Sequence, residues 1–376
     1  MNANGSERID FPEAIRNLPD GYTPEWFGYG VDFSWSPDGS RIVFGFMNDG
    51  ITSPRDPNGG DKSFQLAIMD ADGSNLVEVP LRVAFNRYRS APVYTWAPDG
   101  SKLAFVSDSD DELYIINADG TDLSVVESVA DLKLQADYDG YSSVFAPSWS
   151  PDGNYIAFVW DRNVKSVNLN DETITTIIRP TPPPTTETVN EYLVDPRLTW
   201  STDGEWIVNL QSGVFLFQHI PPEEVIQISS LVGRNWGWSS DGTLLYGQVT
   251  DYDDDNYPTE SLIFNMADMS LMSNPALGSG DYLYGFSPDM MQMVFLSNRD
   301  GNYDIYVADA DGSNVNRLTS SESIERIIGW SPDSTKILFA SDQNDNNDLY
   351  LVNTDGSVET QLTDTVVTEF LAQWKP

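Results

Sequence analysis

The sequence predicts an all-β protein, a seven-bladed β-propeller built from four-stranded antiparallel blades. The main observation is a motif that occurs seven times: an aromatic residue, Ser or Ala, Pro or a polar residue, then Asp and usually Gly. The copies are spaced 38 to 61 residues apart and begin at Trp35, Trp96, Trp149, Trp200, Trp238, Phe286 and Trp330. Self-similarity at such a period is typical of solenoids and propellers and outweighs local propensity. Each period has room for four short strands, which favours propeller blades.

The copy around Trp96 illustrates how one repeat is divided into strands. Strands are expected at 93–96, 102–107, 112–117 and 123–126, where apolar and β-branched residues are concentrated. The Pro-Asp-Gly and Ala-Asp-Gly triplets between them make tight turns, because Pro presets φ, Asp bonds its own backbone and Gly accepts positive φ. Related segments recur at 41–46, 64–79, 155–160, 293–298, 304–319, 336–341 and 348–363.

The repeats also set the domain organisation. They run from about residue 31 to the C-terminus, so we expect one propeller domain at 31–376. Residues 1–30 are interpreted as an N-terminal extension that packs on the propeller or closes it. Residues 370–374 are expected to form an extra inner strand, and eight blades with one split between the termini is the alternative. The aromatic residue that opens each copy is expected in the core, because side chains alternate along a strand and the residue before it is small or polar.

Composition excludes several classes of function. The chain has 58 acidic and 20 Lys or Arg residues and a formal charge of −38, which repels nucleic acid and anionic membranes. The absence of Cys excludes disulfides and thiolate chemistry. No apolar stretch approaches the roughly 18 residues of a membrane span. The first twenty residues lack the basic and apolar regions of a signal peptide. The expected location is extracellular or periplasmic, with the export signal not present in this chain.

Acidic loops provide the candidate metal ligands. Calcium takes six to eight oxygen ligands, and closely spaced Asp residues between the second and third strands of a blade supply carboxylates. The spacing matches no complete calcium loop, so a solvated acidic rim is the alternative interpretation, and Ca²⁺ is the only cofactor suggested. The candidate ligands are Asp251, Asp253, Asp255, Asp342, Asp345 and Asp348.

Arginine and aromatic residues provide the candidate ligand-binding site. Three arginines precede an aromatic motif by three or four residues, at the expected mouth of the channel, where a guanidinium can hold a carboxylate or sulfate. Aromatic residues of the same loops are suited to stacking on sugars or on apolar groups of a partner. Local ion pairing is the alternative for the arginines. The candidates are Arg197, Arg234, Arg326, Trp236, Tyr282 and Tyr252.

The repeat resembles the TolB-like propeller repeat family, a relative of WD repeats. The resemblance is carried by P-x-W-S-P-D-G-x-x-I-A-F followed by I-Y-V-x-D-x-D-G and L-T, best matched at 147–158, 304–319 and 330–363. It implies a propeller that the terminal strands close. Thr202 and Ser240 replace the turn Pro in two repeats, and the copy at Phe286 lacks the turn Gly.

Three functions remain open at this point. The first is a non-catalytic propeller that recognises a protein or a glycan through its loop-rich face. The second is a carbohydrate-active lyase or hydrolase with an axial pocket, because paired carboxylates suffice for glycoside chemistry. The third is a structural protein that self-associates. Propeller-bearing peptidases lack support because the chain has no Gly-x-Ser-x-Gly elbow, and its single histidine, His219, is interpreted as structural.

Overall fold

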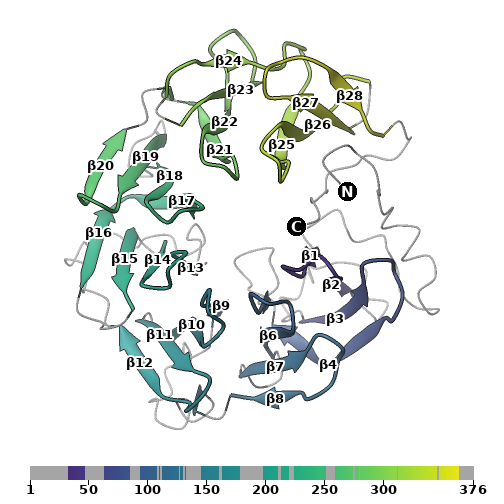
Figure 1. Ribbon diagram of the computed structural model, residues 1–376, viewed down its shortest axis with the longest axis vertical. Coiled ribbons are helices and arrows are strands. Elements are labelled where there is room, and N and C mark those ends of the chain that lie inside the picture. Colours follow the sequence, from purple (N-terminus) through teal and green to yellow (C-terminus); the bar gives the residue numbers. More distant parts are fainter. Residues whose placement is uncertain are drawn as a thin grey trace, which may run out of the picture. The chain divides into compact units, whose positions relative to one another are not determined.

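The computed structural model describes 28 strands in seven four-stranded antiparallel sheets (Figure 1). The described residues are 33–46, 63–84, 94–107, 110, 112–126, 128–129, 132, 145–160, 163–177, 198–210, 213–219, 224–250, 259–273, 276–278, 280–310, 312–344 and 347–363. Each sheet follows the order of its strands in the sequence. This confirms the predicted all-β class and is consistent with seven blades. Residues 1–30 and the C-terminal strand at 370–374, on which the eight-bladed alternative depends, lie outside the described residues.

The described residues divide into two compact units, one of which comprises 33–209 and 215–226. Its first two sheets are β1 (Phe33–Trp35), β2 (Arg41–Phe46), β3 (Ser63–Asp70), β4 (Val77–Ala84) and β5 (Tyr94–Trp96), β6 (Lys102–Val106), β7 (Leu113–Asn117), β8 (Ser124–Val125). It also contains β9 (Phe145–Trp149), β10 (Tyr155–Trp160), β11 (Asn163–Asn168), β12 (Ile174–Ile177) and most of β13 (Leu198–Trp200), β14 (Trp206–Asn209), β15 (Val214–Gln218), β16 (Val225–Ser229). Val214 and residues 227–229 of this last sheet are assigned to the second unit.

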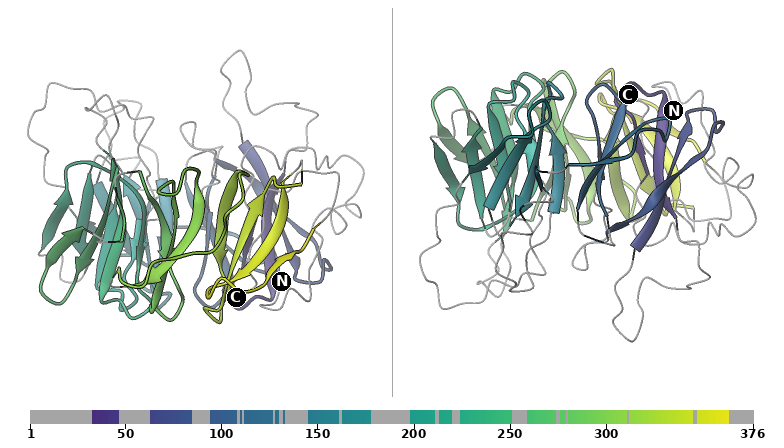
Figure 2. Two further views of the ribbon diagram at one scale, coloured as in Figure 1. Left: turned by 90° about the horizontal axis from the view of Figure 1, so that it is seen from above. Right: turned by 90° about the horizontal axis from the view of Figure 1, so that it is seen from below.

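The second unit comprises 210, 213–214 and 227–363 of the described residues and contains the last three sheets. They are β17 (Val232–Trp238), β18 (Leu244–Thr250), β19 (Thr259–Asn265), β20 (Ser270–Ser273); β21 (Tyr282–Phe286), β22 (Gln292–Ser297), β23 (Asp304–Asp309), β24 (Asn316–Arg317); and β25 (Glu325–Trp330), β26 (Lys336–Ser341), β27 (Asp348–Asn353), β28 (Glu359–Gln361). In Figure 2 the connections of sheet β25–β28, in yellow, lie alternately at its two ends. The second-to-third-strand loop and the exit of the fourth strand therefore share one end, the loop end.

The recurring motif forms the turn between the first two strands of each sheet. In the first copy the Ser36 hydroxyl donates to Asp38 Oδ1 at 2.6 Å and accepts the Arg41 amide at 2.9 Å. Gly39 takes φ of +66°, a left-handed conformation that favours glycine. Where the glycine is missing, Met290 and Ser334 adopt φ of +62° and +61° instead. The turn therefore survives the loss of glycine, and six of the seven copies support it with the Ser–Asp hydrogen bond.

The aromatic residues of the motif lie in the core, as predicted, with one exception. Six of them are between 6 and 9% exposed, whereas Trp238 is only half-buried. Their indole groups also connect neighbouring sheets: Trp96 Nε1 donates to the Ser34 carbonyl at 3.3 Å and Trp200 Nε1 to that of Ser148 at 3.0 Å. Among the described residues, no helix is long and apolar enough to cross a membrane.

Candidate functional site

Several predicted site residues fall outside the described part of the chain. Arg197 and Tyr252 of the candidate ligand site do so, as do the candidate metal ligands Asp251, Asp253, Asp255 and Asp345. Arg234 lies in β17, where its backbone pairs with that of Gln248, but its side chain is not described. The structure therefore gives no geometry for these side chains, and their roles stay predictions.

Trp236, a candidate for stacking on a ligand, is buried in its own sheet. The residue is only 7% exposed, and its indole nitrogen donates to the Gln248 carbonyl at 3.0 Å, within its own sheet. The ring lies over Gly247, where a Cβ atom would approach it to 2.3 Å. Glycine is needed there because any side chain would clash with the indole. Trp236 thus packs β17 against β18 and has little surface to offer a ligand.

The two described metal candidates also have structural partners. Asp348 is fully buried and accepts hydrogen bonds from Gln361 Nε2 at 3.0 Å and from the Thr363 hydroxyl at 3.3 Å. Asp342 Oδ1 accepts the Ile324 amide at 2.7 Å. Within the part of the chain that is described, no group of three or more His, Cys, Asp or Glu side chains is arranged to hold a metal. These two carboxylates accordingly hold strands and loops in place.

Acidic residues of other loops at the loop end also hold strands in place by accepting hydrogen bonds. The sequence analysis did not predict this structural role. The Tyr306 hydroxyl donates to Asp300 Oδ2 at 2.5 Å, and the Tyr114 hydroxyl donates to Asp110 Oδ2 at 2.9 Å. Burial, together with the hydrogen bond and charge of Asp300, raises the pKa of Tyr306 to about 12. The available signal was the tyrosine near the start of the third strand, which follows the loop acid by four residues in one sheet and by six in the other.

Exposed aromatic and apolar side chains gather at the loop end of sheets β21–β24 and β25–β28. We call the set the aromatic patch, defined by Tyr282, Tyr284, Tyr303, Ile324 and Arg326. Tyr282 and Tyr284 are 47 and 45% exposed, Tyr303 is 39% exposed and Ile324 is 74% exposed. The rings of Tyr282 and Tyr303 lie 5.6 Å apart. Of the predicted ligand residues, the structure thus places Tyr282 and Arg326 at the surface of one unit.

Tyr284 and Arg326 lie close enough to interact. The Tyr284 hydroxyl donates to the Ile328 carbonyl, which anchors the ring across the two sheets. Desolvation raises the pKa of Tyr284, and the positive charge of Arg326 acts in the opposite direction. Arg326 is exposed and extends from β25. A guanidinium beside an anchored phenol is suited to contact with a partner's carboxylate or carbonyl groups.

An ion pair between the exposed Arg299 and the buried Asp281 supports the patch. Arg299 donates to Asp281 Oδ2 and to the Ala276 carbonyl, both at 2.8 Å. Its guanidinium lies 5.2 Å from the ring centroid of Phe295 and 5.0 Å from that of Tyr306. Because Asp281 immediately precedes Tyr282, these contacts fix the start of β21 and with it the position of the exposed ring.

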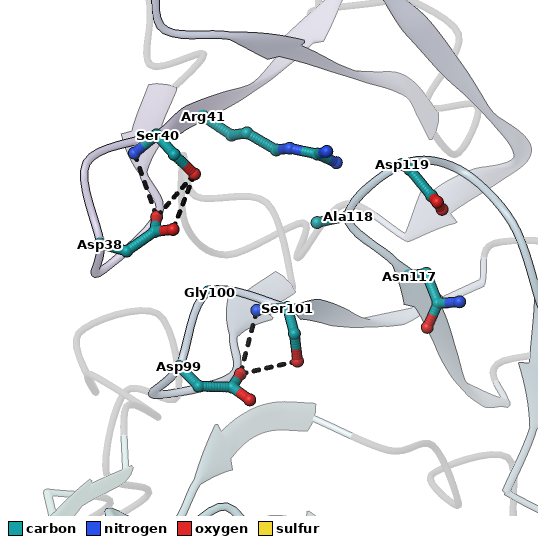
Figure 3. A pocket seen from close by; sticks show the side chains of 9 residues that line it. All are labelled: Asp38, Ser40, Arg41, Asp99, Gly100, Ser101, Asn117, Ala118 and Asp119. Atoms are coloured by element: carbon teal, nitrogen blue, oxygen red, sulfur yellow. Dashed lines mark hydrogen bonds between the residues drawn. The ribbon is translucent and has the colours of Figure 1, made fainter.

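A hollow of about 400 Å³ lies at the opposite end of sheets β1–β4 and β5–β8 (Figure 3). Its carboxylates already accept hydrogen bonds from their own turns: Asp38 from Ser40 and Asp99 from Ser101. These bonds lower the pKa values of both acids, with the Ser36 hydroxyl the main cause for Asp38. The hollow is lined by Asp38, Ser40, Arg41, Asp99, Gly100, Ser101, Asn117, Ala118 and Asp119.

His219 has no surface that a substrate can reach. It is 3% exposed, its Nε2 lies 2.9 Å from the Ser166 hydroxyl, and its ring meets those of Tyr155 and Trp200 edge-on. Desolvation lowers its pKa to about 4, against the opposing effects of the Asp152 charge and the Gly204 carbonyl. The neutral ring is therefore part of the core at neutral pH.

Residues 283–376 match the family model of the TolB β-propeller domain. This confirms the resemblance to TolB-like repeats over the part of the chain that carries most of the aromatic patch. One curated relative, the Tol-Pal system protein TolB of Alcanivorax borkumensis, is 33% identical over 103 residues. That match covers 27% of this chain and only 20% of the length of the relative.

Solved structures extend the likeness in fold. A dipeptidyl peptidase 4 from Porphyromonas gingivalis gives a TM-score of 0.60 at 14% identity, covering 90% of this chain and 54% of that chain. An oligogalacturonate lyase in complex with manganese gives 0.51 at 13% identity, with coverage of 85 and 87%. An oligogalacturonate lyase from Vibrio parahaemolyticus gives 0.50 at 10% identity, with coverage of 86 and 88%. At these identities the likeness concerns the fold alone.

Proposed function

We propose that this protein is a non-catalytic propeller that binds a partner protein through the aromatic patch. The observation that carries the proposal is the concentration of Tyr282, Tyr284 and Tyr303 with Ile324 and Arg326 at one end of two adjacent sheets. Tyrosine and arginine dominate the energetic centres of protein interfaces, because each combines a large contact area with hydrogen-bonding groups.

The rigid support of the patch favours binding. The Tyr284 hydroxyl is bonded to the Ile328 carbonyl, and the Arg299–Asp281 pair fixes the segment before Tyr282. Side chains held before association lose less conformational entropy when a partner arrives. The strong negative charge of the chain, −38, further favours a partner with a basic rim, whose approach would be steered electrostatically.

A periplasmic location is part of the same proposal. It is supported by the match to the TolB β-propeller domain and by the curated relative named as a Tol-Pal system protein. Glycan recognition by the same tyrosines is the alternative ligand class. An exposed aromatic pair such as Tyr282 and Tyr303 offers ring faces for sugar stacking.

The proposal is tested by comparing partner capture by three forms of the protein. The patch variant carries Tyr282→Ser, Tyr303→Ser and Arg326→Ser, and the matched control carries Leu271→Ser and Met272→Ser, which are exposed on β20. A cell-envelope extract is passed over each immobilised form, and retained proteins are quantified by mass spectrometry. We expect one or more proteins whose retention falls at least about tenfold with the patch variant and is kept by the control.

Two results would contradict the proposal. The first is that every retained protein binds the wild type and the patch variant equally. The second is that the patch variant loses binding to a glycan array while its protein partners are unchanged, which would favour the glycan alternative. Unfolding midpoints of the three forms, compared beforehand, establish that the substitutions act on the surface and not on the fold.

A further inference from the structure

A buried carboxylate lies between two residues of the aromatic patch. Glu325 opens β25 between Ile324 and Arg326, yet it is only 5% exposed. Its Oε2 accepts a hydrogen bond from the hydroxyl of Thr319, in the loop between β24 and β25. The Thr319 hydroxyl oxygen also accepts the amide of Ile305 at 2.8 Å. A hydroxyl has one hydrogen and two lone pairs, so it can donate to only one acceptor at a time.

In the neighbouring sheet, β25–β28, the corresponding threonine hydroxyl, that of Thr363, donates to a different carboxylate. Thr363 accepts the Leu349 amide at 2.8 Å, as Thr319 accepts that of Ile305. Its hydroxyl, however, donates to the buried Asp348 of its own sheet, at 3.3 Å from Oδ1, and Gln361 donates to Oδ2 at 3.0 Å. Both oxygens of that carboxylate therefore have donors.

In sheet β21–β24 the corresponding carboxylate is left incomplete. Asp304 is fully buried, and Arg317 donates to its Oδ2 at 2.5 Å, in the position that Gln361 has in the next sheet. Its Oδ1 is buried and accepts no hydrogen bond from any residue that the structure describes. Thr319, whose counterpart bonds this oxygen in the next sheet, donates to Glu325 instead. A buried acceptor without a donor is costly.

Several charges surround Glu325. Asp304 on β23 and Glu359 on β28 repel its ionised form, while the Arg317 guanidinium on β24 is engaged with Asp304 and lies 3.9 Å from Asp300. Burial is the main cause that raises the pKa of Glu325 to about 7, and the Thr319 hydrogen bond opposes it. Arg326, on the same strand, is exposed.

We propose that Thr319 is a two-position hydrogen-bond switch, which donates to Glu325 when that carboxylate is ionised and to Asp304 Oδ1 when Glu325 is protonated. When the pH falls, the Glu325 carboxylate takes up one proton from solvent. The resulting carboxylic acid O–H donates a hydrogen bond to Thr319 Oγ1. The Thr319 hydroxyl rotates and gives its own hydrogen bond to Asp304 Oδ1. No covalent bond to carbon is made or broken, and Asp304 Oδ1 then has a donor.

The first test is the pH dependence of unfolding in the wild type and the Glu325→Gln variant. A group whose pKa is raised in the folded state gives stability as the pH falls, until the pKa of the unfolded chain is reached. Relative to the variant, the wild type should gain roughly 30-fold in its folding equilibrium constant between about pH 8.5 and pH 5.5. An equal pH dependence of the two proteins would overturn the proposal.

The second test locates the Thr319 hydrogen by a double-mutant cycle with Thr319→Val and Asp304→Asn. We expect a coupling of about tenfold in the unfolding constant at about pH 5.5 and less than about twofold at about pH 8.5. In the Glu325→Gln background the coupling should be present at both pH values. The matched control is the Thr363→Val and Asp348→Asn cycle, whose coupling should not change with pH.

A Thr319–Asp304 coupling that is equal at both pH values would overturn the switch. If Asp304→Asn does not fold, infrared titration of ¹³C-glutamate-labelled protein replaces the cycle. A carboxyl signal should titrate near neutral pH in the wild type and be absent from Glu325→Gln. Its midpoint should rise in Thr319→Val, because the charge-assisted hydrogen bond that the ionised form loses is stronger than the neutral one that the protonated form loses. An unchanged midpoint in Thr319→Val would equally overturn the proposal. The inference is independent of the proposed binding function, because no readout involves a partner.

Discussion

The indole nitrogen of Trp149 donates a hydrogen bond of 3.2 Å to the carbonyl oxygen of Thr95 in the adjacent sheet. The same bond joins Trp330 to Gly285 in the second unit, at 3.3 Å. In each case the acceptor is the residue just before the aromatic residue of the preceding repeat. The small or polar residue at that position therefore has a physical role, because it lets the next indole reach the backbone.

The first prediction concerns this bond. Replacing Trp149 with Phe keeps an aromatic ring in the core but removes the donor to the Thr95 carbonyl. Loss of the hydrogen bond and of part of the ring volume should lower the free energy of unfolding by about 2–3 kcal/mol. Urea unfolding followed by tryptophan fluorescence measures it. The converse control is Phe286→Trp, at the motif position where phenylalanine is natural. A loss below about 0.5 kcal/mol in Trp149→Phe would show that the bond adds little.

The second prediction concerns the serine of the turn motif. The Ser331 hydroxyl donates to Asp333 Oδ1 at 2.6 Å and accepts the Lys336 amide at 2.9 Å. Ser331→Ala removes both bonds and should cost about 1–2 kcal/mol of unfolding free energy. The chain offers the reverse experiment at Ala97, the motif copy that lacks the hydroxyl. Ala97→Ser should stabilise the protein by about 0.5–1 kcal/mol.

Thermal unfolding midpoints of the two variants provide the measurement for this pair. The two changes should shift the midpoint in opposite directions. Equal destabilisation by both substitutions would mean that the hydroxyl is not the group that stabilises the turn.

The fold could be predicted from the sequence because its determining interactions are local. The Ser36–Asp38–Gly39 turn is specified by residues within five positions, and six of the seven copies contain the same Ser–Asp hydrogen bond. The site was harder to predict because its contacts depend on strand register. Asp348 is bonded by Thr363, fifteen positions away, so composition alone made it resemble a free metal ligand. Likewise, only the pairing of β17 with β18 shows that Trp236 covers Gly247.

The third prediction concerns the ion pair between the buried Asp304 and the half-buried Arg317. Arg317→Ala leaves the fully buried Asp304 carboxylate without its charged donor and should lower the unfolding free energy by about 3–5 kcal/mol. Arg317→Gln copies Gln361, which donates to Asp348 in the adjacent sheet, and should lose clearly less. Chemical unfolding at neutral pH distinguishes the two variants. Similar losses in both would mean that packing of the arginine stem matters more than its hydrogen bond to the carboxylate.

The last prediction concerns the pH dependence that His219 imposes. Its pKa is about 4 in the folded protein, against 6.5 for an unperturbed histidine. Between these two pH values the unfolded chain binds a proton that the folded protein excludes, so stability falls as the pH drops below 6.5 and the loss is complete near pH 4. The slope cannot exceed about 1.4 kcal/mol per pH unit for one proton, and any access of solvent to the ring reduces it.

The measurement compares the wild type with His219→Gln, whose amide keeps a partner for the Ser166 hydroxyl without titrating. The difference between the two proteins is needed because Glu325 changes stability in the opposite direction over an overlapping range, from 4.5 to about 7. Unfolding free energies at intervals between about pH 7 and pH 4.5 should show the wild type losing stability relative to the variant as the solution becomes more acidic. Parallel curves would mean that the ring is protonated in the folded protein, and therefore that water reaches the space between Tyr155 and Trp200.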